Sequence, residues 1–215
     1  YVDNDDSNEA NKLLDYQSTE AENKLRIEET VRKDDWKINY GAGIEWAEYT
    51  TTTFQKLENE VTLNYSSEIG VCKYGAFGQV SKGVLSERLQ LSLGARMDAN
   101  NFNAHMANPL NQFSPRLSAS YSLSQKMAIN FNTGIYYQLP PYTTLGYRNT
   151  AGELVNKDVK YIQSKHVVLG IEYNTSKNAR ITVEGFYKHY SNYPMDLIDS
   201  ISLANKGSDF GVIGN

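Results

Sequence analysis

The chain has 215 residues, of which 40% are hydrophobic and 21% charged, and this composition excludes a low-complexity or disordered protein. With a net charge of -4 and basic residues scattered singly, it has no basic stripe for nucleic acid, and no apolar run approaches the roughly 20 residues of a membrane-spanning helix. The single cysteine, Cys72, excludes a disulfide framework and a cysteine-based zinc site. Because the sequence lacks an initiator methionine and a signal segment, we expect a fragment of a longer protein.

The chain begins with a polar segment, and we expect residues 1–23 to form a loop ahead of strands and loops over residues 24–215, all within one partial domain. Oxygen-bearing side chains alternate near the start, as in the first half of a calcium-binding loop: Asp3, Asp5, Ser7 and Glu9. Asn8 and Leu14 stand where such a loop has glycine and a bidentate glutamate. These departures favour a solvated acidic loop over a calcium site.

From Leu25 onward, apolar and polar side chains alternate with a period of two, which is typical of β-strands with two different faces. The eight predicted strands lie at Leu25–Lys33, Trp36–Trp46, Val71–Lys82, Leu89–Met97, Phe113–Leu123, Met127–Tyr137, Val167–Tyr173 and Ile181–Tyr187. The last residues, Asp209–Asn215, predict the start of a further strand.

Short and long connections between these strands alternate without exception. The short connections lie near Asp34–Asp35, Gly83–Glu87, Gln125–Lys126 and Thr175–Asn178. The long, polar ones lie at Thr51–Gly70, Ala99–Gln112, Leu139–Lys160 and Ser191–Ser208. Outer-membrane barrels likewise have short turns at one end and long loops at the other. The predicted strands, of about 10–15 residues, are also longer than the 5–6 residues usual in soluble proteins. The sequence therefore predicts an all-β, antiparallel, up-and-down transmembrane β-barrel fragment of about eight strands plus a stub.

Two tryptophans suggest which face meets lipid. Trp36 and Trp46 share one face of the second predicted strand. At about 3.3 Å per residue and a tilt near 40°, their separation projects to roughly 25 Å, the height of the apolar band between aromatic girdles. We expect the apolar face to point outward to lipid and the polar face into the barrel, although a soluble sandwich would show the same alternation with its apolar face inward.

Six short strings follow one another along the chain at Tyr74–Gln79, Leu91–Asp98, Phe113–Tyr121, Tyr136–Tyr142, Val183–Lys188 and Ser202–Gly207. In order and spacing they resemble strand signatures of TonB-dependent outer-membrane receptors. The family's barrel has about 22 strands and is filled by an N-terminal plug carrying the TonB box. The resemblance implies that this chain supplies part of the barrel, without plug or TonB box. The usual string of sugar importers is replaced by Asp98–Phe102, which weakens a glycan-importer assignment.

The resemblance also implies a location, partners and a function. The location is the outer membrane of a Gram-negative bacterium. The partners are outer-membrane lipid, the plug domain of the same parent chain, the TonB complex through that plug and an extracellular nutrient ligand, with no nucleic acid. The function is import of a scarce bulky nutrient such as a siderophore, cofactor, peptide or glycan. A passive porin or adhesin barrel is the alternative, and an outer-membrane protease or lipase is disfavoured because no nucleophile motif is present.

We expect no bound cofactor and no metal site, since the histidines His105, His166 and His189 fall on separate elements. Two groups of side chains are candidate sites. The loop behind Pro140–Pro141 carries aromatic, guanidinium and amide groups suited to stacking on and hydrogen bonding a ligand, although ordinary loop packing would use them equally well: Tyr142, Tyr147, Arg148 and Asn149.

The second group should gather inside the barrel below its rim. Arg96 and Asp98 share the polar face near the end of one predicted strand, and Arg116 lies near the start of the next. Two guanidinium groups held close together require anionic partners, and Asp98 can supply one. We expect either an ion-pair lattice that ties barrel to plug or strand to strand, or a contact with an anionic substrate.

Overall fold

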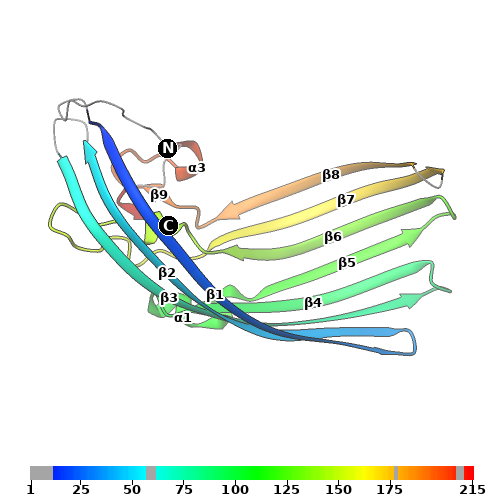
Figure 1. Cartoon of the computed structure of the whole chain (residues 1–215). Coiled ribbons are helices and arrows are strands. Elements are labelled where there is room, and N and C mark those ends of the chain that lie inside the picture. The colour runs from blue at the N-terminus through cyan, green and yellow to red at the C-terminus, as the bar shows by residue number, and fades with distance from the viewer. Residues whose placement is uncertain (1–11, 57–61, 177–178, 207–210) are drawn as a thin grey trace.

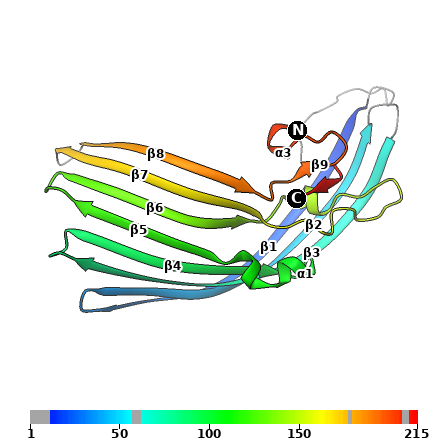
Figure 2. The same ribbon diagram turned by 180° about the vertical axis from the view of Figure 1, so that it is seen from behind.

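In the computed structural model, eight long strands form one antiparallel sheet that curls into half of a barrel (Figures 1 and 2). The structure describes residues 12–56, 62–176, 179–206 and 211–215. The strands are β1 (Leu14–Lys33), β2 (Trp36–Lys56), β3 (Thr62–Val84), β4 (Leu89–Asn100), β5 (Ser114–Ser122), β6 (Met127–Gln138), β7 (Ile162–Ser176) and β8 (Ala179–Ser191). Within the described residues, no helix is long and apolar enough to cross a membrane. The calcium-loop pattern at residues 3–9 lies outside the described residues.

Each strand pairs with its neighbour in sequence, so the up-and-down prediction is confirmed. Within the described chain, β1 and β8 are each paired on one side only, which leaves the curled sheet with two open edges. The short connections gather at one end of the sheet, whereas the long connections, with α1 (Ala104–Ala107) and α3 (Leu203–Lys206), gather at the other (Figure 1).

The two faces of the sheet differ as the alternation predicts. Large apolar side chains stay exposed on the convex face, including Leu25, Leu93, Leu117, Leu169 and Val183, and both Trp36 and Trp46 are exposed on β2. The concave face carries charged and amide groups such as Arg26, Asn39 and Arg96. Because water would penalise so large an apolar surface, the convex face is suited to lipid.

The first three strands run beyond the predicted length, which corrects two expectations. β1 begins at Leu14, so the initial polar loop does not reach residue 23. The long loop expected at Thr51–Gly70 is wrong, because β2 continues to Lys56 and β3 begins at Thr62. The extension forms strands because threonine and tyrosine suit the pleated backbone and their inward-facing side chains are buried there.

The protein's buried core lies at this extended end, between the sheet and the long connections. Its main cluster comprises Tyr49, Ile69, Met106, Leu145, Val159 and Tyr161. Met106 comes from α1, and Leu145 from α2 (Tyr142–Leu145), a short helix in the connection between β6 and β7. A second cluster joins Leu63 and Tyr65 of β3 to Tyr147. The connections therefore fold inward and cover the concave face of the extension.

The C-terminal residues belong to these connections. β9 (Met195–Asp196) pairs with β10 (Ile213–Gly214) in a separate two-stranded sheet. The expectation that the final residues begin another barrel strand is therefore wrong for Ile213 and Gly214. Buried Asn156 holds β10 in place, since its Oδ1 accepts a 2.8 Å hydrogen bond from the N–H of Ile213. A fourth helical segment, η3 (Pro109–Gln112), connects α1 to β5.

Candidate functional site

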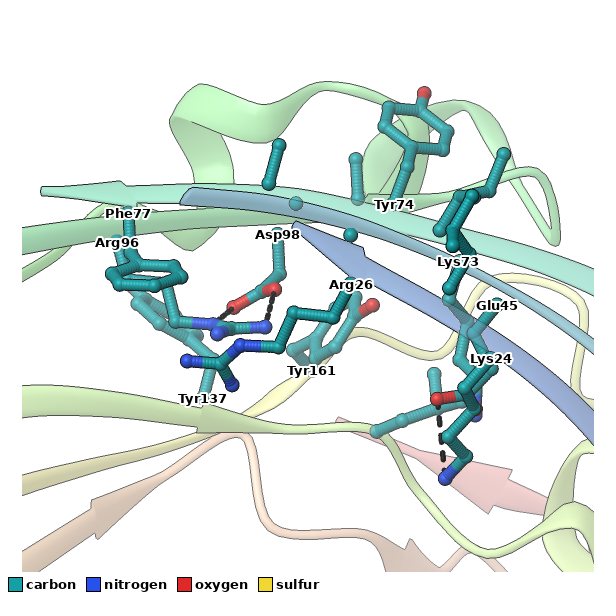
Figure 3. Close-up of a pocket in the computed structure, with 17 residues that line it drawn as sticks. Lys24, Arg26, Glu45, Lys73, Tyr74, Phe77, Arg96, Asp98, Tyr137 and Tyr161 are labelled. Carbon is teal, nitrogen blue, oxygen red and sulfur yellow. Dashed lines mark hydrogen bonds and ion pairs between the residues drawn. The ribbon is translucent and has the colours of Figure 1, made fainter. Parts of the chain in front are cut away.

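A cavity of about 390 Å³ lies on the concave face, where β1–β4 approach the inward-folded connections (Figure 3). Its lining combines basic, acidic and aromatic side chains: Lys24, Arg26, Glu45, Lys73, Phe77, Arg96, Asp98, Tyr137 and Tyr161. In contrast, Tyr74 points to the other side of the sheet in Figure 3. The cavity thus offers cations, carboxylates and phenols together, which suits a polar partner with several hydrogen-bonding groups.

Lys73 of β3 is the centre of a charged network at one end of this cavity. Its Nζ donates to Glu22 Oε1 of β1 at 3.0 Å and to the hydroxyl oxygen of Tyr142 at 2.7 Å, and it pairs with Glu45 of β2. The Tyr142 hydroxyl in turn donates to the same Glu22 oxygen at 2.9 Å. Lys24 is ion-paired with both carboxylates, at 2.5 Å to Glu22 and 3.2 Å to Glu45. The network therefore joins three strands to the β6–β7 connection.

The predicted rim cluster forms in part. Arg96 donates two hydrogen bonds of 2.6 Å to Asp98, from Nε and Nη2 to the two carboxylate oxygens. Arg116 does not join this pair. Its guanidinium lies 4.5 Å from the centre of the Tyr136 ring and is 3.4 Å from Ser114 Oγ. The face of an aromatic ring attracts a cation, so the Tyr136 ring stabilises the Arg116 guanidinium although Arg116 does not contact Asp98.

The four predicted ligand residues lie in the inward-folded connection and contact the protein itself. Tyr142 stacks on Tyr49 with ring centres 6.0 Å apart, and Tyr147 packs edge-on against Tyr65 at 5.8 Å. Burial raises the pKa of Tyr147, so this phenol stays neutral even in alkaline solution. These two tyrosines attach the connection to the extended strands.

The two polar members of the group shape the same connection. Arg148 Nε donates to Ser67 Oγ at 3.1 Å, and its Nη1 donates to the Gly152 carbonyl oxygen at 2.9 Å. Asn149 Oδ1 accepts from the N–H groups of Ala151 and Glu153 and closes a tight turn. Contact between these residues and a ligand stays a prediction, because their principal contacts here are internal.

The network residues Glu22, Glu45 and Lys73 were missed in the sequence. Glu45 and Lys73 are direct cross-strand partners, so the register of β2 and β3 could have revealed that pair. Glu22 lies within the predicted initial loop, and the approach of Tyr142 depends on the fold of a long connection. In the part of the chain that the structure describes, no group of three or more histidine, cysteine, aspartate or glutamate residues could hold a metal.

The long up-and-down strands, the exposed apolar convex face and the charged concave face define the wall of a β-barrel membrane protein. Residues 1–210 match the family model for the β-barrel of TonB-dependent receptor-like proteins, and the chain belongs to that family. The family comprises transport receptors rather than enzymes.

Solved structures share the fold. The copper transporter OprC is 19% identical with a TM-score of 0.63, over 84% of this chain and 32% of OprC. FpvAI, in its complex with pyocin S2, is 13% identical with the same TM-score, over 86% of this chain and 27% of the matched chain. This chain thus spans 32% and 27% of the length of these two proteins. No curated protein matches the sequence.

Proposed function

We propose that this chain forms part of the barrel wall of a TonB-dependent receptor in the outer membrane of a Gram-negative bacterium. In this proposal the complete receptor imports a scarce bulky nutrient, such as a siderophore, cofactor, peptide or glycan. The nutrient binds from outside, and movement of an N-terminal plug, driven by the TonB complex, opens the way inward.

The observation that carries this proposal is the charge distribution on the concave face. A groove of about 380 Å³ on this face is lined by four cations: Arg26, Lys37, Arg96 and Arg116. Arg26 and Arg96 are paired with Glu28 and Asp98. Within the described residues, no carboxylate is ion-paired with Lys37 or Arg116. A groove in which two of the four cations lack an ion-paired carboxylate suits a polar partner that presents carboxylates, as a plug domain can.

The inward-folded connection has a role in this proposal. Tyr142, Tyr147, Arg148 and Asn149 hold it over the cavity, so that a ligand arriving from outside meets the connection before the Arg96–Asp98 pair. Cations and phenols in that cavity favour a ligand rich in anionic or hydroxyl oxygen atoms. The Arg96–Asp98 pair then contacts either the ligand or the plug.

A passive porin or adhesin is the second candidate function, because a polar concave face also suits a water-filled channel. Conductance separates the two. The complete receptor, reconstituted in a planar lipid bilayer, should stay closed, while a version lacking the plug should conduct as the positive control. Steady conductance of the complete protein would contradict the proposal. Import should also cease in cells without TonB, and import that persists there would equally contradict it.

A further inference from the structure

A separate groove lies on the opposite, convex face of the sheet. It has a volume of about 560 Å³ and crosses all five strands from β4 to β8. Five of its twelve lining residues carry large apolar side chains: Leu93, Leu117, Ile135, Val167 and Tyr187. Val167, Leu117 and Tyr187 are all exposed, so the described part of the chain leaves this apolar hollow uncovered.

Two smaller residues, Pro115 and Thr133, also line the groove. Thr133 of β6 is the direct cross-strand partner of Leu117 of β5. The Thr133 hydroxyl donates a 2.9 Å hydrogen bond to the carbonyl oxygen of His166, so its polar group is already satisfied. The groove can therefore receive hydrocarbon without leaving that hydroxyl unpaired.

Two basic side chains line one end of the groove. Lys165 of β7 and His189 of β8 are direct cross-strand partners, and both are exposed. Within the described residues, neither forms an ion pair with a carboxylate. Along β7 the convex-face residues Ile171, Leu169 and Val167 are apolar until Lys165 is reached. The two basic groups therefore mark the boundary of the apolar band at the end that carries the long connections.

We propose that this groove binds one phosphorylated, multiply acylated glycolipid of the outer leaflet, with acyl chains against Leu93, Leu117 and Val167 and a phosphate group against Lys165 and His189. The orientation rests on the proposed function, which places the long connections outside the cell. Charge complementarity selects this occupant, because an acyl chain alone would leave the basic pair without a partner, whereas a phosphorylated headgroup at the membrane surface attracts basic side chains.

The test measures lipid binding to the purified complete receptor by native mass spectrometry. The probe is bisphosphorylated lipid A, compared with its dephosphorylated form and with phosphatidylethanolamine. The double variant Lys165→Gln/His189→Gln should lower affinity for the bisphosphorylated probe roughly tenfold and leave the dephosphorylated form almost unaffected.

A matched control exists on the same two strands. His166 and Lys188 are also direct cross-strand partners, one register position away, but face the opposite side of the sheet. The double variant His166→Gln/Lys188→Gln should keep the affinity of the unmodified receptor. Equal losses from both double variants, equal binding of phosphatidylethanolamine, or a protein dimer in place of the lipid complex would each overturn the proposal. Since the readout is lipid mass and not transport, a receptor that conducts ions but binds lipid A here would refute only the proposed function.

Discussion

The extended strands β2 and β3 and the edge strand β8 follow the same alternation of side chains but bury them differently. On β2, Ala47, Tyr49, Thr51 and Thr53 are buried on the concave face, beneath the inward-folded connections. On β8, by contrast, side chains on both faces are exposed over almost the whole strand. The comparison shows that strand pattern determines which face a side chain joins, whereas the connections determine whether that face becomes a protein core or stays open to a partner.

Removing a large buried ring from the covered region should produce the largest effect. Tyr147→Ala deletes the aromatic group packed on Tyr65, and loss of a large buried aromatic costs about 3–5 kcal/mol. We expect the β6–β7 connection to detach from the extended strands. Limited proteolysis of intact cells should then cut within residues 149–153, while the exposed-site control Tyr190→Ala should stay resistant. Equal resistance of both variants would show that the connection does not depend on this contact.

The second-largest effect should come from placing a charge on the convex face of the open region. Leu93→Arg places a cation on the lipid-facing side, at a cost of about 2–4 kcal/mol near the middle of a membrane. Ser92→Arg, one residue away on the concave face, should be milder. Heat-modifiable gel mobility of the complete receptor measures the assembled fraction, and equal yields from the two variants would contradict the assignment of the faces.

The charged network around Lys73 lies where the two regions meet, and losing it should lower the stability of the protein by a smaller amount. Lys73→Met leaves Glu22, Glu45 and Tyr142 without their shared donor, and lost hydrogen bonds to charged groups are worth roughly 2 kcal/mol. The more exposed Lys24 is the matched control, and Lys24→Met should cost less than about 1 kcal/mol. Chemical denaturation of the detergent-solubilised receptor measures the stability of both variants. Similar unfolding midpoints for Lys73→Met and Lys24→Met would contradict a central role for Lys73 in the network.

The smallest effect should be a pH dependence of local stability in the long connections, where Asp196 lies. Burial alone would raise the pKa of Asp196, but hydrogen bonds from Lys206 and from the N–H groups of Ile198 and Asp199 outweigh it and lower this pKa. The stabilisation is therefore present above the unfolded pKa of aspartate, about 3.9, and is lost as pH falls through the lower folded value.

This pH dependence can be measured as the hydrogen-exchange protection of backbone N–H groups near β9. Protection of the N–H groups of Ile198 and Asp199 should fall in strongly acidic solution in the unmodified protein. In Asp196→Asn, the same protection should be lower at neutral pH and vary less with acidity. A pH dependence that is unchanged by Asp196→Asn would contradict the assignment.

The sequence predicted the eight strands and their two faces because alternation is a local property. It failed from Thr51 onward, where the hydroxyl groups of successive threonines resemble a polar loop. In the structure Thr51 and Thr53 hydrogen-bond each other, and Thr51 also donates to the Gln17 carbonyl oxygen, so both side chains are buried without loss. The Arg96–Asp98 pair was predictable from residues two apart on one strand face, whereas the approach of Tyr142 to Lys73 depends on long-range folding.

The most direct test of the central claim compares two adjacent residues of β7. In a receptor with Cys72→Ala, a fluorescent label is attached through Leu169→Cys on the convex face or Val168→Cys on the concave face. Brominated lipids in the surrounding bilayer should strongly quench the label at residue 169 and leave the label at residue 168 nearly unquenched. Equal quenching at both residues, or stronger quenching at residue 168, would contradict a lipid-facing convex surface and an inward-facing charged one.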